Sequence, residues 1–173
     1  SMFVYTNSMT NIIEENVIEN NGCNAISARN VRIHGVMLGV FGQIGNHGGV
    51  FRKNTIAALA NGNVGEAGNV APEINGLALN FGNWEVSNNM ISLRNGTTGT
   101  HITNTNTTVV GIRDGLLNTA GQGAQYLYNS IYIYGQNGGS APGNASYAFL
   151  RSAINYAGPA LSNGAPPTLR NNI

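Results

Sequence analysis

Short segments of alternating apolar and polar residues recur along the chain, and five of them align on an asparagine. In each segment a β-branched or aromatic residue stands three positions before the asparagine, and an isoleucine stands two positions after it. A spacing of two is typical of a strand that buries one face, so the pattern predicts a strand on each side of every asparagine. The aligned asparagines are Asn16, Asn54, Asn89, Asn129 and Asn171. The preceding residues are Ile13, Phe51, Val86, Tyr126 and Thr168, and the isoleucines are Ile18, Ile56, Ile91, Ile131 and Ile173.

The aligned asparagines follow one another at steps of 38, 35, 40 and 42 residues. Between them lies a second family of segments, each starting with a small residue and then an apolar one, at 25–28, 76–79, 111–114 and 148–151. Short strands at unequal steps favour stacked coils with variable loops over a propeller or a helical repeat. We therefore expect an all-β solenoid of about four to five coils, with at least three short strands in each coil.

The asparagines suit the bends of such a coil. Asparagine tolerates the left-handed backbone conformation that a sharp bend needs, and its side chain bonds to nearby backbone. Stacked from coil to coil, the amides are expected to form a hydrogen-bonded ladder, as they do in cross-β stacks. The five isoleucines would stack beside them as an apolar column inside the coil.

An asparagine at a turn followed by a short apolar strand resembles the right-handed parallel β-helix proteins, which include pectate lyases, polygalacturonases and many large surface proteins of bacteria. Residues 128–135 and 146–151 resemble repeats in long secreted proteins of the Bacteroidetes group. The resemblance covers nearly the whole chain and implies a right-handed parallel β-helix with residues 1–173 as one domain. It also implies an extracellular or cell-surface microbial protein, but no particular activity, because one fold hosts many functions.

Four segments rich in Gly, Asn, Ser, Thr and Ala are expected to be variable: 60–75, 95–108, 135–145 and 153–167. The threonine-rich part, 97–108, fits either an added β-hairpin or a solvated loop, and the loop is favoured. Residues 8–20 also fit a short helix capped by Thr10, but their register with the later repeats favours a strand.

The residues at the two ends of the chain predict contact with further coils. Ser1 and Met2 resemble residues left by cleavage of an affinity tag, so a longer natural chain is expected. Ile173 falls at a predicted core position, and neither end carries the polar cap that a solenoid normally needs. We expect either flanking coils of the same chain or copies stacked end to end, which would make a filament.

Charged residues are scarce, and this scarcity excludes some classes of binding partner. Only 9% of residues are charged and the net charge is +1, whereas the chain holds 28 Asn and 24 Gly. The eight Lys and Arg residues are scattered, which argues against a nucleic-acid partner. No apolar stretch approaches the ~18–20 residues of a membrane-spanning helix. Cys23 is the only cysteine, so neither an internal disulfide nor a cysteine metal site is expected.

Polysaccharide-degrading chemistry would need carboxylates. A hydrolase needs a pair of them, and a calcium-dependent lyase needs several oxygen ligands together with a base. The best candidate cluster is Asp114 with Arg113 and Arg151, although a surface ion pair between Asp114 and Arg151 is the simpler interpretation. The three histidines, His34, His47 and His101, lack metal-ligand spacing and are expected on the surface or in loops. We predict no catalytic residue, cofactor or metal.

A stripe of tyrosines is the remaining candidate for binding. If Ile131 and Ile133 point inward, then Tyr132 and Tyr134 point outward and join Tyr128 in an outer aromatic stripe. Such a stripe can stack on sugar rings or on a packed neighbour, whereas packing under a loop is the simpler interpretation.

Together these features favour a non-catalytic, extracellular structural or adhesive β-helix. Its expected partners are flanking coils of the same chain or further copies of the chain end to end, and glycans are a further candidate. The alternative is a fragment of a carbohydrate-binding protein, or of a polysaccharide lyase or glycoside hydrolase.

Overall fold

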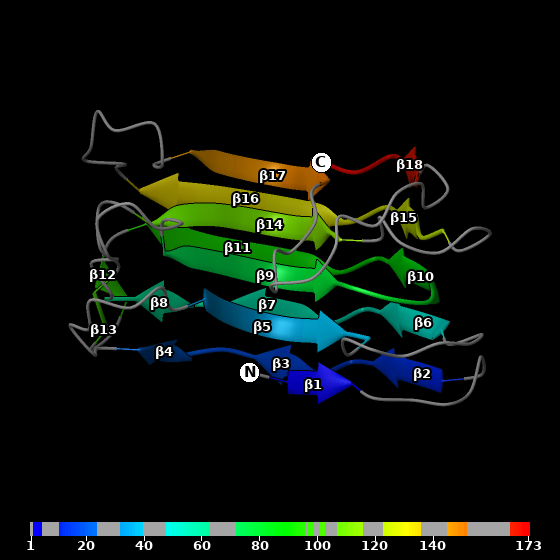
Figure 1. Cartoon of the computed structure of the whole chain (residues 1–173), viewed down its shortest axis with the longest axis horizontal. Helices are drawn as coiled ribbons and strands as arrows, with labels where there is room; N and C mark the ends of the chain where they lie inside the picture. Colours follow the sequence, from blue (N-terminus) through cyan, green and yellow to red (C-terminus); the bar gives the residue numbers. More distant parts are fainter. Residues whose placement is uncertain are drawn as a thin grey trace, which may run out of the picture.

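The computed structural model contains three parallel β-sheets, and the strands of each sheet follow one another along one common axis (Figure 1). The structure describes residues 2–4, 11–23, 32–39, 48–62, 72–95, 97–98, 101–102, 107–115, 123–135, 145–151 and 167–173. Successive strands along the chain enter the three sheets in turn, and every pairing within these sheets is parallel. The result is the all-β solenoid of about four to five coils that the spacing of the asparagines predicts.

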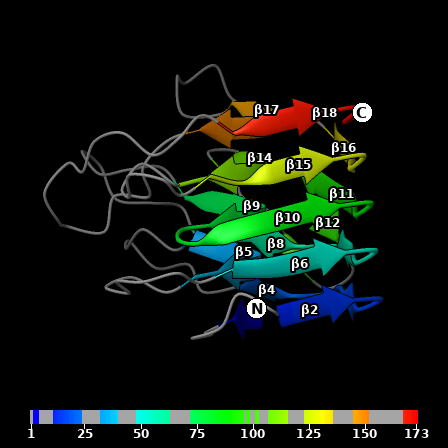
Figure 2. The ribbon, with the colours of Figure 1, turned by 90° about the vertical axis from the view of Figure 1, so that its right-hand side faces the viewer.

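Four coils place one strand in each sheet, and the coil of β17 and β18 has strands in two of the sheets among the described residues. Sheet A holds β1 (Met2–Val4), β5 (Arg32–Leu38), β9 (Glu73–Leu79), β14 (Thr108–Asp114) and β17 (Ser146–Arg151). Sheet B holds β2 (Asn11–Glu14), β6 (Gly48–Arg52), β10 (Asn83–Ser87), β15 (Gln125–Leu127) and β18 (Thr168–Arg170). Sheet C holds β3 (Val17–Ile18), β7 (Thr55–Ala57), β11 (Met90–Asn95) and β16 (Ser130–Gly135). Figure 2 shows the strands of sheet B as successive layers from β2 to β18.

Two small pairs of strands lie outside the three sheets. The first pairs β4 (Gly22–Cys23) with β8 (Ala60–Asn61) in parallel. The second pairs β12 (Thr97–Thr98) with β13 (His101–Ile102) in antiparallel orientation. The favoured loop interpretation of this threonine-rich segment was therefore wrong, and the hairpin alternative is confirmed. The helix alternative for residues 8–20 was wrong as well, because β2 and β3 occupy that region.

The interior is built from columns of side chains that repeat from coil to coil. In sheet C, Ile91 stacks between Ile56 and Ile131. Sheet B contributes the large side chains, of which Phe51, Trp84 and Tyr126 are buried. Burial of each such side chain contributes about 1.5–3 kcal/mol. Stability is therefore expected to be distributed over all the coils.

Sheets A and C approach closely at a column of glycines. Gly35 and Gly76 occupy the same register position, and a Cβ on Gly76 would lie 2.6 Å from Ile91 Cγ2. The small residue of the second segment family is needed here because an isoleucine of sheet C packs against the backbone of sheet A. Between Asn16 and Asn54 this place belongs to residues 35–38, because Val36 pairs with Leu77. The prediction that residues 25–28 fill it was wrong, and those residues lie outside the described ranges.

Candidate functional site

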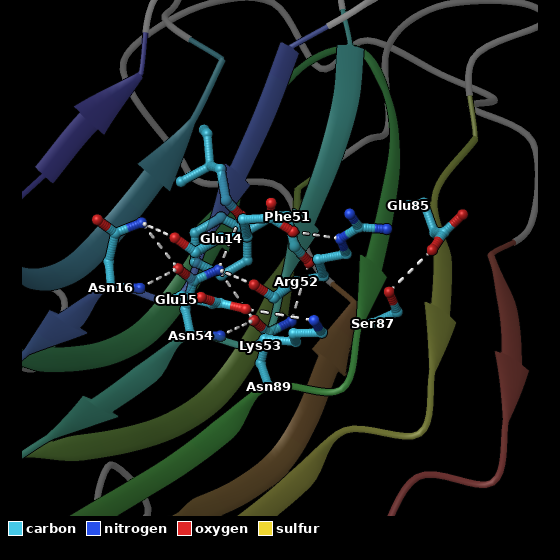
Figure 3. A network of polar contacts seen from close by, with 11 residues as sticks. Glu14, Glu15, Asn16, Phe51, Arg52, Lys53, Asn54, Glu85, Ser87 and Asn89 are labelled. Atoms are coloured by element: carbon cyan, nitrogen blue, oxygen red, sulfur yellow. Dashed lines mark hydrogen bonds and ion pairs between the residues drawn. The ribbon is translucent and has the colours of Figure 1, made fainter.

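A ladder of asparagine side chains joins the coils at the bend between sheets B and C (Figure 3). Each Nδ2 donates a hydrogen bond of 2.9–3.1 Å to Oδ1 of the asparagine in the next coil. The backbone N–H of the same residue donates to that Oδ1 as well. The ladder runs through Asn16, Asn54, Asn89, Asn129 and Asn172.

The ladder also reaches back to the preceding coil. Nδ2 of Asn54 donates to the carbonyl of Ile13, and Nδ2 of Asn89 donates to the carbonyl of Phe51. Asn54, Asn89 and Asn129 are buried, so these bonds satisfy groups that are shielded from water. Each inner asparagine therefore ties its own coil to the coil on either side.

The register predicted for the last coil was wrong by one residue. Asn172, and not Asn171, accepts the hydrogen bonds from Asn129. Leu169 consequently takes the place predicted for Thr168, because it pairs with Tyr126. Ile173 then follows the ladder asparagine directly and is 89% exposed, so it does not join the core column. Of the other isoleucines in that column, Ile56 and Ile91 are buried, whereas Ile18 and Ile131 are partly buried against the core.

The bend itself uses the residue before each ladder asparagine. The φ angle is positive at Glu15, Lys53, Asn88, Tyr128 and Asn171, with values between 49° and 60°. The expectation that the aligned asparagine takes this conformation was therefore wrong at four positions, whereas Asn171 does take it. An L-residue in the left-handed region costs about 1–2 kcal/mol, which the two-sided hydrogen bonding of the adjacent ladder offsets.

Opposite charges stack on the outer face of sheet B, beside the ladder (Figure 3). Arg52 Nε donates to Glu14 at 2.6 Å, and Lys53 Nζ lies 3.3 Å from Glu15. The hydrogen bond from Arg52 lowers the pKa of Glu14 below its ordinary value. Both pairs join neighbouring coils, and both are exposed to solvent, so screening by water and salt keeps their contribution to stability small.

A second polar cluster is buried on sheet A. The Glu73 carboxylate contacts the guanidinium of Arg113 and lies 3.3 Å from Arg32 Nε. Arg113 Nε also donates to Asn75 Oδ1 at 3.0 Å. This cluster crosses three strands, β5, β9 and β14. It was missed in the sequence because Glu73 and Asn75 fall inside a segment that was read as a variable loop.

His34 lies on the same sheet and is only 5% exposed, so the prediction of a surface histidine was wrong. Neither ring nitrogen has a hydrogen-bond partner among the described residues. Burial lowers the pKa of His34 to about 4, and the positive charges of Arg32 and Arg113 add to this effect. The imidazole is therefore neutral at physiological pH. His47 lies outside the described residues, as does the side chain of His101.

Asp114 lies inside the solenoid. It occupies the position that Leu79 holds one coil earlier, and it is 1% exposed. Arg151 Nε lies 3.9 Å from its Oδ2, so the predicted ion pair is confirmed, but its location on the surface was wrong. Arg113 pairs with Glu73 instead, so the three residues do not converge as one catalytic cluster. Burial raises the pKa of Tyr126 well above its ordinary value, and the charge of Asp114 contributes.

The tyrosine stripe borders a cavity at the C-terminal end of the stack. Tyr128, Tyr132 and Tyr134 are 55%, 65% and 40% exposed. The rings of Tyr132 and Tyr134 stack with centroids 5.0 Å apart. The adjoining cavity has a volume of about 450 Å³ and is lined by β16 and by Ser146 and Ala148 of β17. Both isoleucines and both stacked tyrosines of β16 are among its lining residues.

Neither a metal centre nor a bilayer-spanning helix appears in the part of the chain that the structure describes. No three His, Cys, Asp or Glu side chains gather there in a way that could hold a metal ion. The same residues include no helix of the length and hydropathy needed to cross a bilayer. No family model matches the chain, and neither a curated protein nor a solved structure shows significant similarity to it.

Proposed function

We propose that the chain is a non-catalytic structural or adhesive segment of an extracellular β-helix, acting as a rigid spacer in a surface protein or a fibre. The observation that carries this proposal is the asparagine ladder, which links each coil to its neighbours through buried and partly buried side-chain hydrogen bonds. Ion pairs are used in the same way: the pairs Arg52–Glu14 and Arg113–Glu73 both join different coils.

A rigid spacer should hold its two ends at one distance. Val17 lies in β3 of sheet C, and the backbone of Ile173 hydrogen-bonds to β16 in register with it, four coils away; the two residues are 66% and 89% exposed. With neighbouring strands about 4.8 Å apart, their backbones are expected to lie about 19 Å apart. The test places spin labels at Val17→Cys and Ile173→Cys in a Cys23→Ser background and measures the distance distribution by double electron–electron resonance.

A narrow distribution is expected, and its width should match that of a control pair at Val17→Cys and Met90→Cys, two coils apart. A broad distribution for the outer pair alone would contradict a rigid spacer. Screening the unlabelled chain against neutral and acidic polysaccharides, with and without calcium, checks the non-catalytic part. New reducing ends or unsaturated products would contradict it.

Carbohydrate binding is the second candidate function. It is favoured by the stacked rings of Tyr132 and Tyr134 beside the 450 Å³ cavity, because aromatic faces pack on sugar rings. The test is a glycan array followed by calorimetry on the double variant Tyr132→Ala/Tyr134→Ala. Tyr147→Ala is the matched control, because Tyr147 is also 40% exposed but lies on β17. Binding that is lost only in the double variant would support this function, and no binding by the unmodified chain would remove it.

A further inference from the structure

The strands β5, β9 and β14 in the middle of sheet A are shielded from water on the outer face of the sheet as well as on its inner face. Ile74 of β9 belongs to the hydrophobic core, so its neighbours Glu73 and Asn75 point to the outer face. On β5, Arg32 and His34 stand beside these two residues in the register of the sheet. Glu73, Asn75 and His34 are at most 5% exposed, so the outer face holds a polar cluster away from solvent.

The acceptor oxygens of this cluster are already used by the arginines. Arg113 reaches across from β14, where its guanidinium contacts one oxygen of Glu73 and its Nε donates to Asn75 Oδ1 at 3.0 Å. The other oxygen of Glu73 lies 3.3 Å from Arg32 Nε. Neither ring nitrogen of His34 has a hydrogen-bond partner in the part of the chain that the structure describes. A neutral imidazole carries one N–H, and a buried N–H needs an acceptor.

Positive charge exceeds negative charge in the same cluster. The two guanidinium groups of Arg32 and Arg113 face the one carboxylate of Glu73, so the described side chains of the cluster carry a net charge of +1. Burial, and then the charges of the two arginines, lower the pKa of His34 to about 4, so both guanidinium groups act on the imidazole. An arginine keeps its proton inside a protein, and buried charge without a counterion is costly. The cluster therefore favours an added negative charge where His34 needs an acceptor.

We propose that the cluster binds one chloride ion beside the His34 imidazole, on the outer face of sheet A. The ion accepts a hydrogen bond from the imidazole N–H, and its charge balances the second guanidinium group. A halide is favoured over a phosphate or a carboxylate, because a polyatomic anion would bury further acceptor atoms that also need donors. The arginines suit this ion because a guanidinium group is more weakly hydrated than an ammonium group. The bound ion would join side chains of three successive coils and add a chloride-dependent contact to the stack.

A chloride titration followed at the His34 imidazole tests the site. The chain is isotope-labelled on histidine, dialysed into sodium gluconate and titrated with sodium chloride at constant ionic strength, while nuclear magnetic resonance follows the ring nitrogens. Comparison with His34→Leu assigns the resonances. The resonances of His34 are expected to shift along a saturating curve that is half complete below about 0.15 M chloride. The resonances of His47 and His101 report any general effect of salt in the same sample.

Substitutions of the charged groups have opposite expected effects on the affinity for chloride. Arg32→Gln removes the unbalanced positive charge, so the affinity should fall about tenfold. Glu73→Gln removes the carboxylate that repels the ion, so the affinity should rise about tenfold. Arg52→Gln is the matched control, because it removes an arginine from the exposed pair with Glu14 and should leave the affinity unchanged.

Three results would overturn the proposal. If chloride does not shift the resonances of His34, the ion does not bind at the imidazole. If Arg32→Gln lowers the affinity no more than Arg52→Gln does, the shift is a general effect of salt. If Glu73→Gln binds chloride more weakly than the unmodified chain, the charge balance of the cluster does not govern binding. Should Glu73→Gln fail to fold by circular dichroism, the comparison of Arg32→Gln with Arg52→Gln still decides the question.

Discussion

Asn89 sits in the middle of the ladder, and replacing it with alanine tests whether the ladder holds the coils together. The substitution removes four hydrogen bonds: two from Asn54 to Oδ1, one from Nδ2 to the Phe51 carbonyl and one to Asn129. At about 1 kcal/mol for each bond, the free energy of unfolding should fall by roughly 4 kcal/mol. The cost is expected to approach this sum because Asn89 is buried and water cannot replace the lost partners.

Asn16→Ala is the matched control, since it removes two side-chain bonds at the outer end of the same ladder. Those bonds are exposed or partly buried, so a loss of roughly 1 kcal/mol is expected. Urea unfolding followed by circular dichroism measures both variants against the unmodified chain. Hydrogen exchange would show whether protection is lost first in the coils next to Asn89. Equal destabilisation by the two substitutions would refute the idea that the buried ladder stabilises the stack.

Three further substitutions address other parts of the stack. Gly76→Ala is expected to lower the free energy of unfolding in urea by about 2 kcal/mol, because the new Cβ would lie 2.6 Å from Ile91 Cγ2. Ala148→Gly, at the same register position of the last coil, should lower it by under about 1 kcal/mol. Glu73→Gln should lower the melting temperature and cost about 3 kcal/mol by leaving buried guanidinium charge uncompensated, whereas the exposed Glu14→Gln should cost much less; similar losses would contradict this reasoning. The pKa of His34 is about 4 in the folded state, below the unfolded value near 6.5. The folded state therefore favours the neutral imidazole, and the contribution of His34 to the free energy of unfolding is complete above about pH 6.5. This contribution is lost as the pH falls toward 4, by up to about 3 kcal/mol. The free energy of unfolding of His34→Gln should depend less on pH over that window, and an unchanged dependence would show that other groups cause it.

The strands, their three-per-coil grouping and the stacking of asparagines could be predicted from the sequence because they depend on local spacing. Alternation of apolar and polar residues indicates a strand face, and its recurrence beside an asparagine indicates the coil. The small residue at the close approach of sheets A and C was visible in the same way at Gly76, Gly111 and Ala148, whereas Gly35 was missed because residues 25–28 were assigned to its place.

The register of the last coil depended on contacts between coils. The local pattern selects Asn171, whereas the structure selects Asn172 because the donors of Asn129 meet its Oδ1. The earlier pair Asn88–Asn89 carried a usable signal, since its second member joins the ladder while the first takes the left-handed bend.

Burial of the polar groups was likewise decided by the tertiary structure. Asp114 and Glu73 read as ordinary surface or loop carboxylates, yet they are 1% and 5% exposed. Their surroundings come from strands about 40 residues away, such as Arg113 for Glu73. Local spacing therefore determined which residues form strands and that the strands repeat. Closure of each coil onto the next determined which side chains meet, because hydrogen bonds and ion pairs between coils join residues that are adjacent only in space.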